Sequence, residues 1–197
     1  MLLLIFVKHP IPGQVKTRLG RTLGMEKAAE IYGHLLAFTL KESKKSSATK
    51  AVFYGNTVPE QDLWSEAGYP RFSQKGDGLG ERMQHAFEWG FAQGHERIAI
   101  IGSDCPNISG ELITEAFERL KAHDFVMGPA DDGGYYLLGM SAPFYTPFHE
   151  KIWSTGSVFQ DTIGDLVRGE KSYALLPMYS DIDEEIDLKG TFLEKTL

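Results

Sequence analysis

The stretch "RIAIIG", residues Arg97 to Gly102, decides the fold class of this sequence. It is continuously apolar after its first residue, which is typical of a central strand covered on both faces of a sheet. The run "LLLIFV", Leu2 to Val7, has the same character and predicts a buried first strand. Both runs indicate a sheet that lies inside the protein.

Outward from these runs, short apolar segments alternate with segments of helical spacing. Further strands are predicted at Lys50 to Tyr54, Arg71 to Gln74, Asp124 to Gly128, Tyr135 to Met140 and Ser172 to Pro177. Helices are predicted at Met25 to Lys44, Pro59 to Trp64, Leu79 to Gln93 and Ser109 to Ala122. Another helix is predicted to start at Ser157, where Ser157 and Gln160 have the spacing of a capping box. A weaker helical segment is predicted at Glu184 to Lys195, with a break at Gly190. This alternation predicts an α/β protein with a largely parallel sheet.

Length and composition narrow the class of protein. The 197 residues fit one compact domain, residues 1–197, and the formal net charge of −7 argues against a nucleic-acid binder. Cys105 is the only cysteine and cannot form an intrachain disulfide; we expect it to be a small buried residue. The N-terminal apolar run is too short to span a bilayer and lacks a cleavage site. We therefore expect a cytoplasmic protein without nucleic-acid or membrane partners.

In sheets of this kind, ligands bind beyond the carboxyl ends of the strands, so the loops there are the places to search. The first is "VKHPIPGQVKTRLG", Val7 to Gly20, which carries several cations and no acidic residue. Its spacing fits neither a P-loop nor a dinucleotide fingerprint. Its prolines and glycine let the backbone approach a ligand, and Lys16 and Arg18 can bind phosphate oxygens. The alternative is a solvated basic loop.

Three acidic segments follow other strands. In "IGSDCPNIS", Asp104 could hold a divalent cation or only cap a turn. "GPADDGGYYLLG", Gly128 to Gly139, could be a hairpin turn or a backbone lying close to a flat or sugar-like ligand. In "YSDIDEEIDL", Asp181 and Asp183 could join Asp104 on a metal or cap the terminal helix, Asp183 being the better cap.

Six motifs together resemble one bacterial family. They are "FVKHPIPGQVKTRLG", "GDGLGERM", "IGSDCPNI", "GPADDGGYYLLG", "IWSTGSV" and "DIDEEIDL", in this order over nearly the whole chain. The sequence resembles the DUF2064 family, also called selenodomain-associated or arsenosugar-associated transferase 1, of the nucleotide-diphospho-sugar transferase superfamily. The resemblance implies a Rossmann-like three-layer α/β/α sandwich of the GT-A type.

The resemblance also implies site residues, position by position. The phosphates of a nucleotide would lie against Lys8, Gly13, Lys16, Thr17 and Arg18, and the nucleoside against Gly76, Gly78, Leu79 and Arg82. The acceptor or sugar side would be formed by Asp132, Gly133, Gly134, Tyr135, Trp153 and Thr155. A Mg²⁺ or Mn²⁺ ion would be held by Asp104 with Asp181 or Asp183. One departure is a single Asp followed by Cys-Pro where many glycosyltransferases have D-x-D, which puts weight on a remote second ligand.

These observations lead to three hypotheses of function. The first is a metal-dependent glycosyltransferase acting on a nucleoside-diphosphate sugar and a small-molecule acceptor, with Asp104, Asp132 and Lys16 as catalytic residues. The second is a nucleotidylyltransferase that joins a nucleoside triphosphate to a phosphorylated small molecule and releases pyrophosphate. The third is a catalytically silent nucleotide-binding module.

Overall fold

The computed structural model describes residues 1–196, whose strands form one seven-stranded sheet in the order β3-β2-β1-β4-β6-β5-β7. The strands are β1 (Leu2–Val7), β2 (Thr49–Tyr54), β3 (Arg71–Ser73), β4 (Ile98–Ile101), β5 (Phe125–Pro129), β6 (Tyr135–Met140) and β7 (Tyr173–Leu175). All neighbouring pairs are parallel except those of β6, which runs antiparallel to β4 and to β5. The prediction of a mostly parallel sheet is therefore confirmed.

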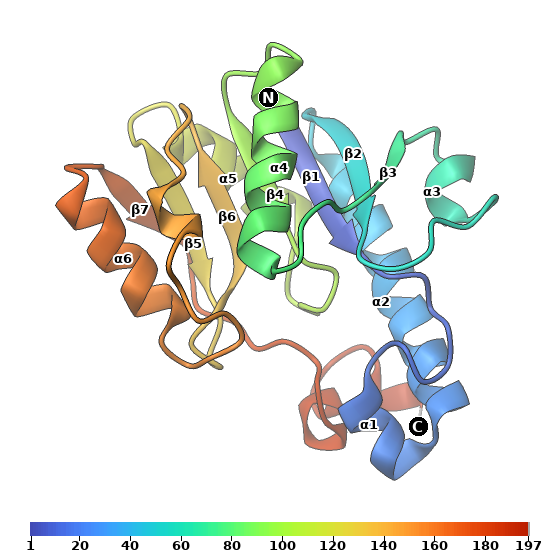
Figure 1. Ribbon diagram of the computed structural model, residues 1–197. Helices are drawn as coiled ribbons and strands as arrows, with labels where there is room; N and C mark the ends of the chain where they lie inside the picture. Colours follow the sequence, from blue (N-terminus) through green and yellow to red (C-terminus); the bar gives the residue numbers. More distant parts are fainter. Residues whose placement is uncertain (197) are drawn as a thin grey trace.

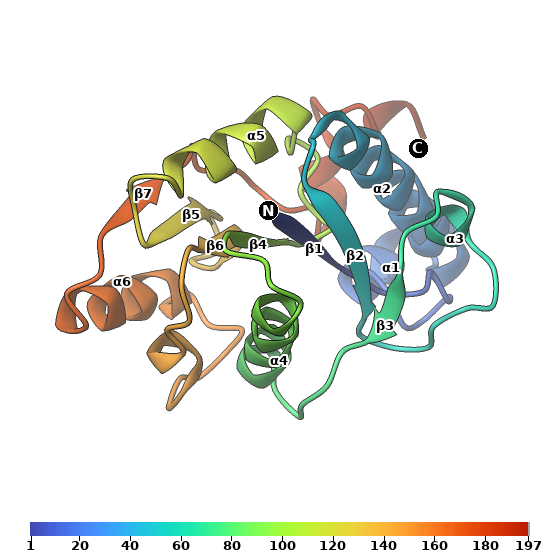
Figure 2. The ribbon, with the colours of Figure 1, turned by 90° about the horizontal axis from the view of Figure 1, so that it is seen from above.

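Helices cover both faces of this sheet (Figures 1 and 2). One face carries α2 (Met25–Lys45) and α5 (Gly110–Arg119), and the other carries α4 (Leu79–Ala92) and α6 (Val158–Arg168). Shorter helices are α1 (Thr17–Leu23) and α3 (Leu63–Glu66), and the 3-10 helices are η1 (Thr146–Phe148), η2 (Glu185–Leu188) and η3 (Glu194–Thr196). This is the three-layer α/β/α arrangement that the family resemblance implies.

The apolar run of β1 explains the two layers of core. Because successive strand side chains point to opposite faces, Leu3 and Ile5 pack with α2 and α5, while Leu2 and Leu4 pack with α4 and α6. All four side chains are fully buried. At about 25 cal/mol per Å² of apolar surface, each such side chain stabilises the fold by roughly 1.5–3 kcal/mol.

The direction of the strands decides where a ligand can bind. The ends of β1, β2, β3 and β4 lie at one edge of the sheet because these strands are parallel. The antiparallel strand β6 begins at that same edge, with Tyr135. Loops after four strands and the start of a fifth therefore meet there.

The structure differs from the sequence-based expectations at four places. The segment after Lys16 forms α1, whose seven residues are too few to display a helical period. The short helix α3 begins at Leu63 and not at Pro59, because the Asp62 carboxylate accepts hydrogen bonds from the backbone N–H groups of Trp64 and Ser65.

The predicted capping box at Ser157 is also wrong. The Ser157 hydroxyl donates to the Asp161 carboxylate instead of accepting from the helix backbone. The last segment forms only η2 and η3 on either side of Gly190, which agrees with the predicted interruption but not with a regular α-helix. No helix in residues 1–196 is long and apolar enough to cross a membrane.

Candidate functional site

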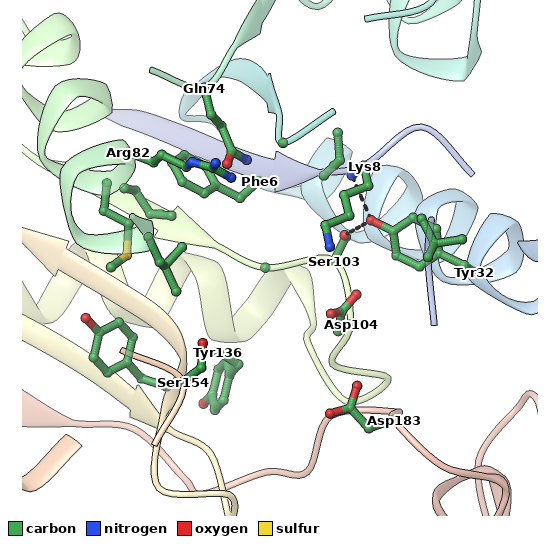
Figure 3. Close-up of a pocket in the computed structure, with 18 of the residues that line it drawn as sticks. Phe6, Lys8, Tyr32, Gln74, Arg82, Ser103, Asp104, Tyr136, Ser154 and Asp183 are labelled. Atoms are coloured by element: carbon green, nitrogen blue, oxygen red, sulfur yellow. Dashed lines mark hydrogen bonds between the residues drawn. The ribbon is translucent and has the colours of Figure 1, made fainter. Parts of the chain in front are cut away.

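A cavity of about 610 Å³ opens at the edge where the parallel strands end. Lys8 follows β1, Gly55 follows β2, Gln74 follows β3 and Asp104 follows β4, and all four line it. Figure 3 shows Lys8, Asp104 and Asp183 toward one end, and Gln74 and Arg82 toward the other. The cavity thus has a strongly charged end and a more mixed end.

Nine residues proposed from the sequence line this cavity: Lys8, Lys16, Thr17, Arg18, Leu79, Arg82, Asp104, Tyr135 and Asp183. Eight others do not line it: Gly13, Gly76, Gly78, Asp132, Gly133, Gly134, Trp153 and Thr155. Asp181 is also absent from the cavity wall, although it lies close to the charged end.

Lys16 is the centre of the charged end. Its Nζ lies 2.9 Å from Asp104 Oδ2 and 3.2 Å from Asp183 Oδ1, and its side chain is only 5% exposed. Burial alone would lower the pKa of Lys16, but the charges of Asp104 and Asp183 outweigh burial and raise that pKa, so the ammonium stays charged. Its backbone is left-handed, with φ 44° and ψ 45°, a conformation that favours glycine and is unusual for lysine.

Two further cations extend the charged end. Arg18 Nη1 lies 3.2 Å from Asp183 Oδ2, and its side chain is 65% exposed. Lys8 is exposed at the end of β1 and has a fixed backbone, because its N–H donates to the Tyr32 hydroxyl at 2.9 Å. The same hydroxyl pairs with Ser103 Oγ at 2.8 Å (Figure 3), so α2 ties the loop after β1 to the loop after β4.

One of the two acidic partners of Lys16, Asp183, comes from the C-terminal segment. The backbone N–H of Ile182 donates to the carbonyl of Asp104 at 3.0 Å, which docks this segment beside the loop after β4. Asp183 is not the cap of η2: the N-cap is Glu184, and the Asp187 carboxylate accepts hydrogen bonds from the backbone N–H groups of Asp183 and Glu184. The Asp183 carboxylate is therefore free to pair with Lys16 and Arg18.

The Asp181 carboxyl is a weaker acid than an ordinary aspartate. Burial, followed by the charge of Asp104, raises the pKa of Asp181 to about 7. Asp132 and Asp183 raise the pKa of Asp181 further and Lys16 lowers it. Burial and three negative charges thus act on Asp181, and the charge of Lys16 offsets only part of their effect.

The other end of the cavity is formed by the loop after β3 and the start of α4. Arg82 Nε donates to the carbonyl of Gly76 at 2.9 Å, and Gln74 Nε2 donates to the carbonyl of Phe53 at 3.0 Å. Gly76 has φ +118°, which explains why glycine stands there. The carbonyl of Gly76 therefore positions the Arg82 side chain without itself lining the cavity, and Arg82 and Leu79 form part of the cavity wall.

The "DDGG" segment forms the hairpin turn between β5 and β6. Asp132 is exposed, and its Oδ1 accepts a hydrogen bond from the Gly134 backbone N–H at 2.8 Å. Gly133 has φ +86°, and a Cβ there would lie 2.1 Å from the carbonyl oxygen of Gly156. The turn therefore packs against the 152–156 segment, and only the following residue, Tyr135, reaches the cavity wall.

The 152–156 segment brings Ser154 to the cavity wall. Ser154 is part of the motif "IWSTGSV", but it was not among the site residues expected from the sequence. Trp153 packs against Gly80 at the start of α4, where a Cβ would lie 2.5 Å from Trp153 Nε1. Lys151 anchors the segment from below: its Nζ lies 3.1 Å from Asp165 Oδ2, and its side chain is 3% exposed.

Sequence reasoning missed several wall residues besides Ser154. Tyr32 fits the helical period of α2 and was taken as core, and nothing in the sequence marks its hydroxyl as part of the site. Ser103 directly follows the strand predicted at Arg97 to Gly102, and Gln74 is the last residue of the strand predicted at Arg71 to Gln74; their place at strand ends was the available signal. Cys105 is buried as expected, and burial raises the pKa of its thiol to about 12.

The charged end provides some, but not all, of the ligands that a divalent cation needs. Within residues 1–196, no three His, Cys, Asp or Glu side chains come together closely enough to hold a metal ion. Asp104 and Asp183 do converge on one cation, the Lys16 ammonium. Mg²⁺ usually needs only one or two protein carboxylates, with water and substrate phosphates completing its shell. Asp104 and Asp183 can therefore serve as the two carboxylate ligands of such an ion. Among residues 1–196, no third side chain joins them as a ligand.

Comparison with solved structures identifies close and distant relatives. A protein from Desulfovibrio desulfuricans G20, provisionally assigned as a nucleotide-diphospho-sugar transferase, is 31% identical with a TM-score of 0.89, over 98% of this chain and 90% of that chain. An inositol-1-phosphate CTP transferase from T. maritima is 9% identical, with a TM-score of 0.62 over 99% and 94% of the two chains. Rv0371c from Mycobacterium tuberculosis H37Rv, in complex with manganese, is 12% identical, with a TM-score of 0.52 over 95% of each chain.

The two distant relatives share the fold alone, whereas the Desulfovibrio protein is similar in sequence throughout. A search of the curated proteins found no match. The profile of the family described as "Uncharacterized protein conserved in bacteria (DUF2064)" matches residues 39–155. The match spans more than half of the chain and includes the loop of Asp104 and the "DDGG" turn, so the chain belongs to the DUF2064 family.

Proposed function

We propose that this protein is a transferase that uses a nucleotide-activated donor, namely a nucleoside-diphosphate sugar. The observation that carries the proposal is the convergence of Lys16, Asp104 and Asp183 at the charged end of a 610 Å³ cavity. Cations there suit phosphate oxygens, and the remaining volume suits a nucleoside and a sugar. The Desulfovibrio relative, provisionally assigned as a nucleotide-diphospho-sugar transferase, supports the same class.

In this proposal, the phosphates of the donor bind at the charged end. Lys16 acts there as a point charge, Arg18 as a two-pronged donor, and Lys8 lies at the end of β1 beside them. Asp104 and Asp183 hold a Mg²⁺ or Mn²⁺ ion, which supplies positive charge to the phosphate oxygens and the leaving group when bound. The manganese complex of Rv0371c supports this choice of metal.

The nucleoside and the acceptor take the rest of the cavity. Gln74, Leu79 and Arg82 surround the nucleoside, because they line the end away from the phosphates. Tyr135 and Ser154 face the transferred group. Asp132 takes the proton of the acceptor hydroxyl from its place on the hairpin turn outside the cavity wall; its charge acts on Asp181 at the charged end.

A second candidate function is nucleotidylyl transfer, in which a phosphorylated acceptor displaces pyrophosphate from a nucleoside triphosphate. The observation that favours it is the number of cations: Lys8, Lys16 and Arg18 all line the cavity, enough for the charge of a triphosphate. The fold shared with the T. maritima CTP transferase is consistent with it.

The test begins with a thermal-shift panel of nucleoside triphosphates and nucleotide sugars, each with and without Mn²⁺. A ligand at a hundred times its dissociation constant should stabilise the protein by about 2.7 kcal/mol. Asp104→Asn should lose the metal-dependent part of this shift. Glu115→Gln, on an exposed ion pair of α5, is the matched control and should keep it.

The ligand that binds is then incubated with candidate acceptors. Release of a nucleoside diphosphate supports glycosyl transfer, and release of pyrophosphate supports nucleotidylyl transfer. Binding without turnover under all conditions would favour a silent nucleotide-binding module. No metal-dependent shift with any nucleotide would contradict the proposal.

A further inference from the structure

The charged end of the cavity already contains one cation supplied by the chain itself. Lys16 Nζ is within 3.2 Å of a carboxylate oxygen on both Asp104 and Asp183. The lysine side chain is almost fully buried, whereas the two carboxylates are 41% and 45% exposed. The ammonium thus lies on the protein side of the two carboxylates, which keep their other faces open.

Electrostatics makes a cation between these groups necessary. The Asp104 and Asp183 carboxylates converge on one point, because an oxygen of each lies within 3.2 Å of Lys16 Nζ. Without Lys16, these carboxylates would repel one another, and the exposed Arg18 is paired with Asp183 but not with Asp104. A buried ammonium costs free energy unless it is paired, so Lys16 also needs these carboxylates as partners.

We propose that Lys16 is an exchangeable stand-in for the divalent cation, and that binding of metal with nucleotide moves its ammonium from the carboxylates to phosphate. The inference rests on the proposed function, because it takes Asp104 and Asp183 as the metal ligands. A doubly charged ion competes for the two carboxylates, and the displaced ammonium then needs another anion. The donor phosphates supply it.

The proposal has a thermodynamic consequence. Metal alone must displace Lys16 without giving it a new partner, so metal alone binds weakly. Nucleotide removes that penalty, and by linkage the metal strengthens nucleotide binding by the same factor. Lysine suits this exchange because its ammonium is a compact charge on a flexible stem, whereas arginine makes fixed, planar pairs. The left-handed backbone of Lys16 is the kind of local strain that marks switching positions.

The first test is a Mn²⁺ titration without nucleotide, with free Mn²⁺ measured by electron paramagnetic resonance. Lys16→Met keeps the stem and removes the charge, and it should bind Mn²⁺ at least tenfold more tightly than the natural protein. Lys27→Met makes the same change of net charge in an exposed pair of α2 and should leave Mn²⁺ affinity unchanged. Adding Asp183→Asn to Lys16→Met should remove the gain.

The outcomes separate the two proposals. If the natural protein binds Mn²⁺ with nucleotide, but Lys16→Met shows no gain for Mn²⁺ alone, the stand-in is overturned and the metal site remains. If neither protein binds Mn²⁺ with or without nucleotide, the metal-dependent function itself fails, and the stand-in with it.

A second test uses the natural protein and does not depend on how the variant folds. Lysine acylation followed by mass spectrometry reports the exposure of each amine. Lys16 should be protected in the free protein, become reactive with excess Mn²⁺ alone, and be protected again with Mn²⁺ and nucleotide. Unchanged protection at every Mn²⁺ concentration that binds the protein would overturn the exchange.

Discussion

Folding buries the Asp181 carboxyl and brings the charge of Asp104 near it, and this gives the protein a pH dependence whose sign can be derived. The native pKa is about 7 and the ordinary value is 3.8. The native state therefore holds the proton more tightly than the unfolded state does. The stabilisation is fully present below pH 4 and is lost as the pH rises through 7.

Asp181→Asn removes this titration with little change of shape. The free energy of unfolding of the natural protein should fall more steeply between pH 5 and pH 8 than that of the variant. Urea denaturation at both pH values, in the presence of a chelator, measures the difference. Equal slopes for the two proteins would mean that Asp181 ionises normally in the native state.

At the residue scale, the sequence predicted which side chains carry charge but not how they pair. Lys16 and Asp104 were expected as a phosphate ligand and a metal ligand, on separate loops. Their salt bridge depends on the left-handed backbone of Lys16, which no residue type at that position signals. The sequence left Asp183 open as a metal ligand or as a helix cap, and the N-cap of η2 is Glu184, with Asp187 as the reciprocal partner of its capping box.

At the scale of elements, the contact between α4 and the 152–156 segment gives a prediction. Gly80→Ala puts a Cβ 2.5 Å from Trp153 Nε1, so the indole must move. Overpacking of this kind costs about 1–3 kcal/mol of stability. It should also weaken nucleotide binding, because Leu79 and Arg82 on α4 and Ser154 beside Trp153 line the cavity.

The control for Gly80→Ala is the same change at Gly33 in α2. No atom lies within 4 Å of a Cβ there, so Gly33→Ala should stabilise the protein by about 0.5–1 kcal/mol through helix propensity. Urea denaturation and the thermal shift with nucleotide measure both variants. A loss of stability in both would show that the effect is not steric.

The elements themselves were predictable to different degrees. The apolar runs of β1 and β6 were predicted to the residue, because a strand buried on both faces leaves an uninterrupted pattern. The short helices α1 and α3 were missed or misplaced, because their ends depend on backbone conformation and capping at Lys16 and Asp62. Topology was the least accessible level: the antiparallel β6 follows from the hairpin turn, which the sequence left open as one of two alternatives.

At the scale of the whole molecule, the C-terminal segment both closes the core and supplies the site. Leu188 is fully buried in the cluster that includes α1 and α2, and Asp183 lies five positions before it. Leu188→Ala should cost about 2–5 kcal/mol of stability. Because Asp183 is carried by the same segment, metal-dependent nucleotide binding should weaken too.

Ile186→Ala is the control, since Ile186 is 60% exposed on the same turn and its loss should change stability by less than about 0.5 kcal/mol. Both variants are compared by urea denaturation and by the nucleotide thermal shift with Mn²⁺. Full nucleotide binding in a destabilised Leu188→Ala protein would show that the segment docks independently of its apolar anchor.

Lys16 and Asp183 pair across a separation of 167 positions in the chain, and this separation affects when the pair can form during translation. At about 5–20 residues per second, translation needs on the order of 10–30 s to pass from one to the other. During that time, the nascent chain has its cationic loop and most of its sheet but not Asp183. A partly synthesised chain therefore lacks one of the two carboxylates that pair with Lys16, and the charged end is completed only when the last segment has been made.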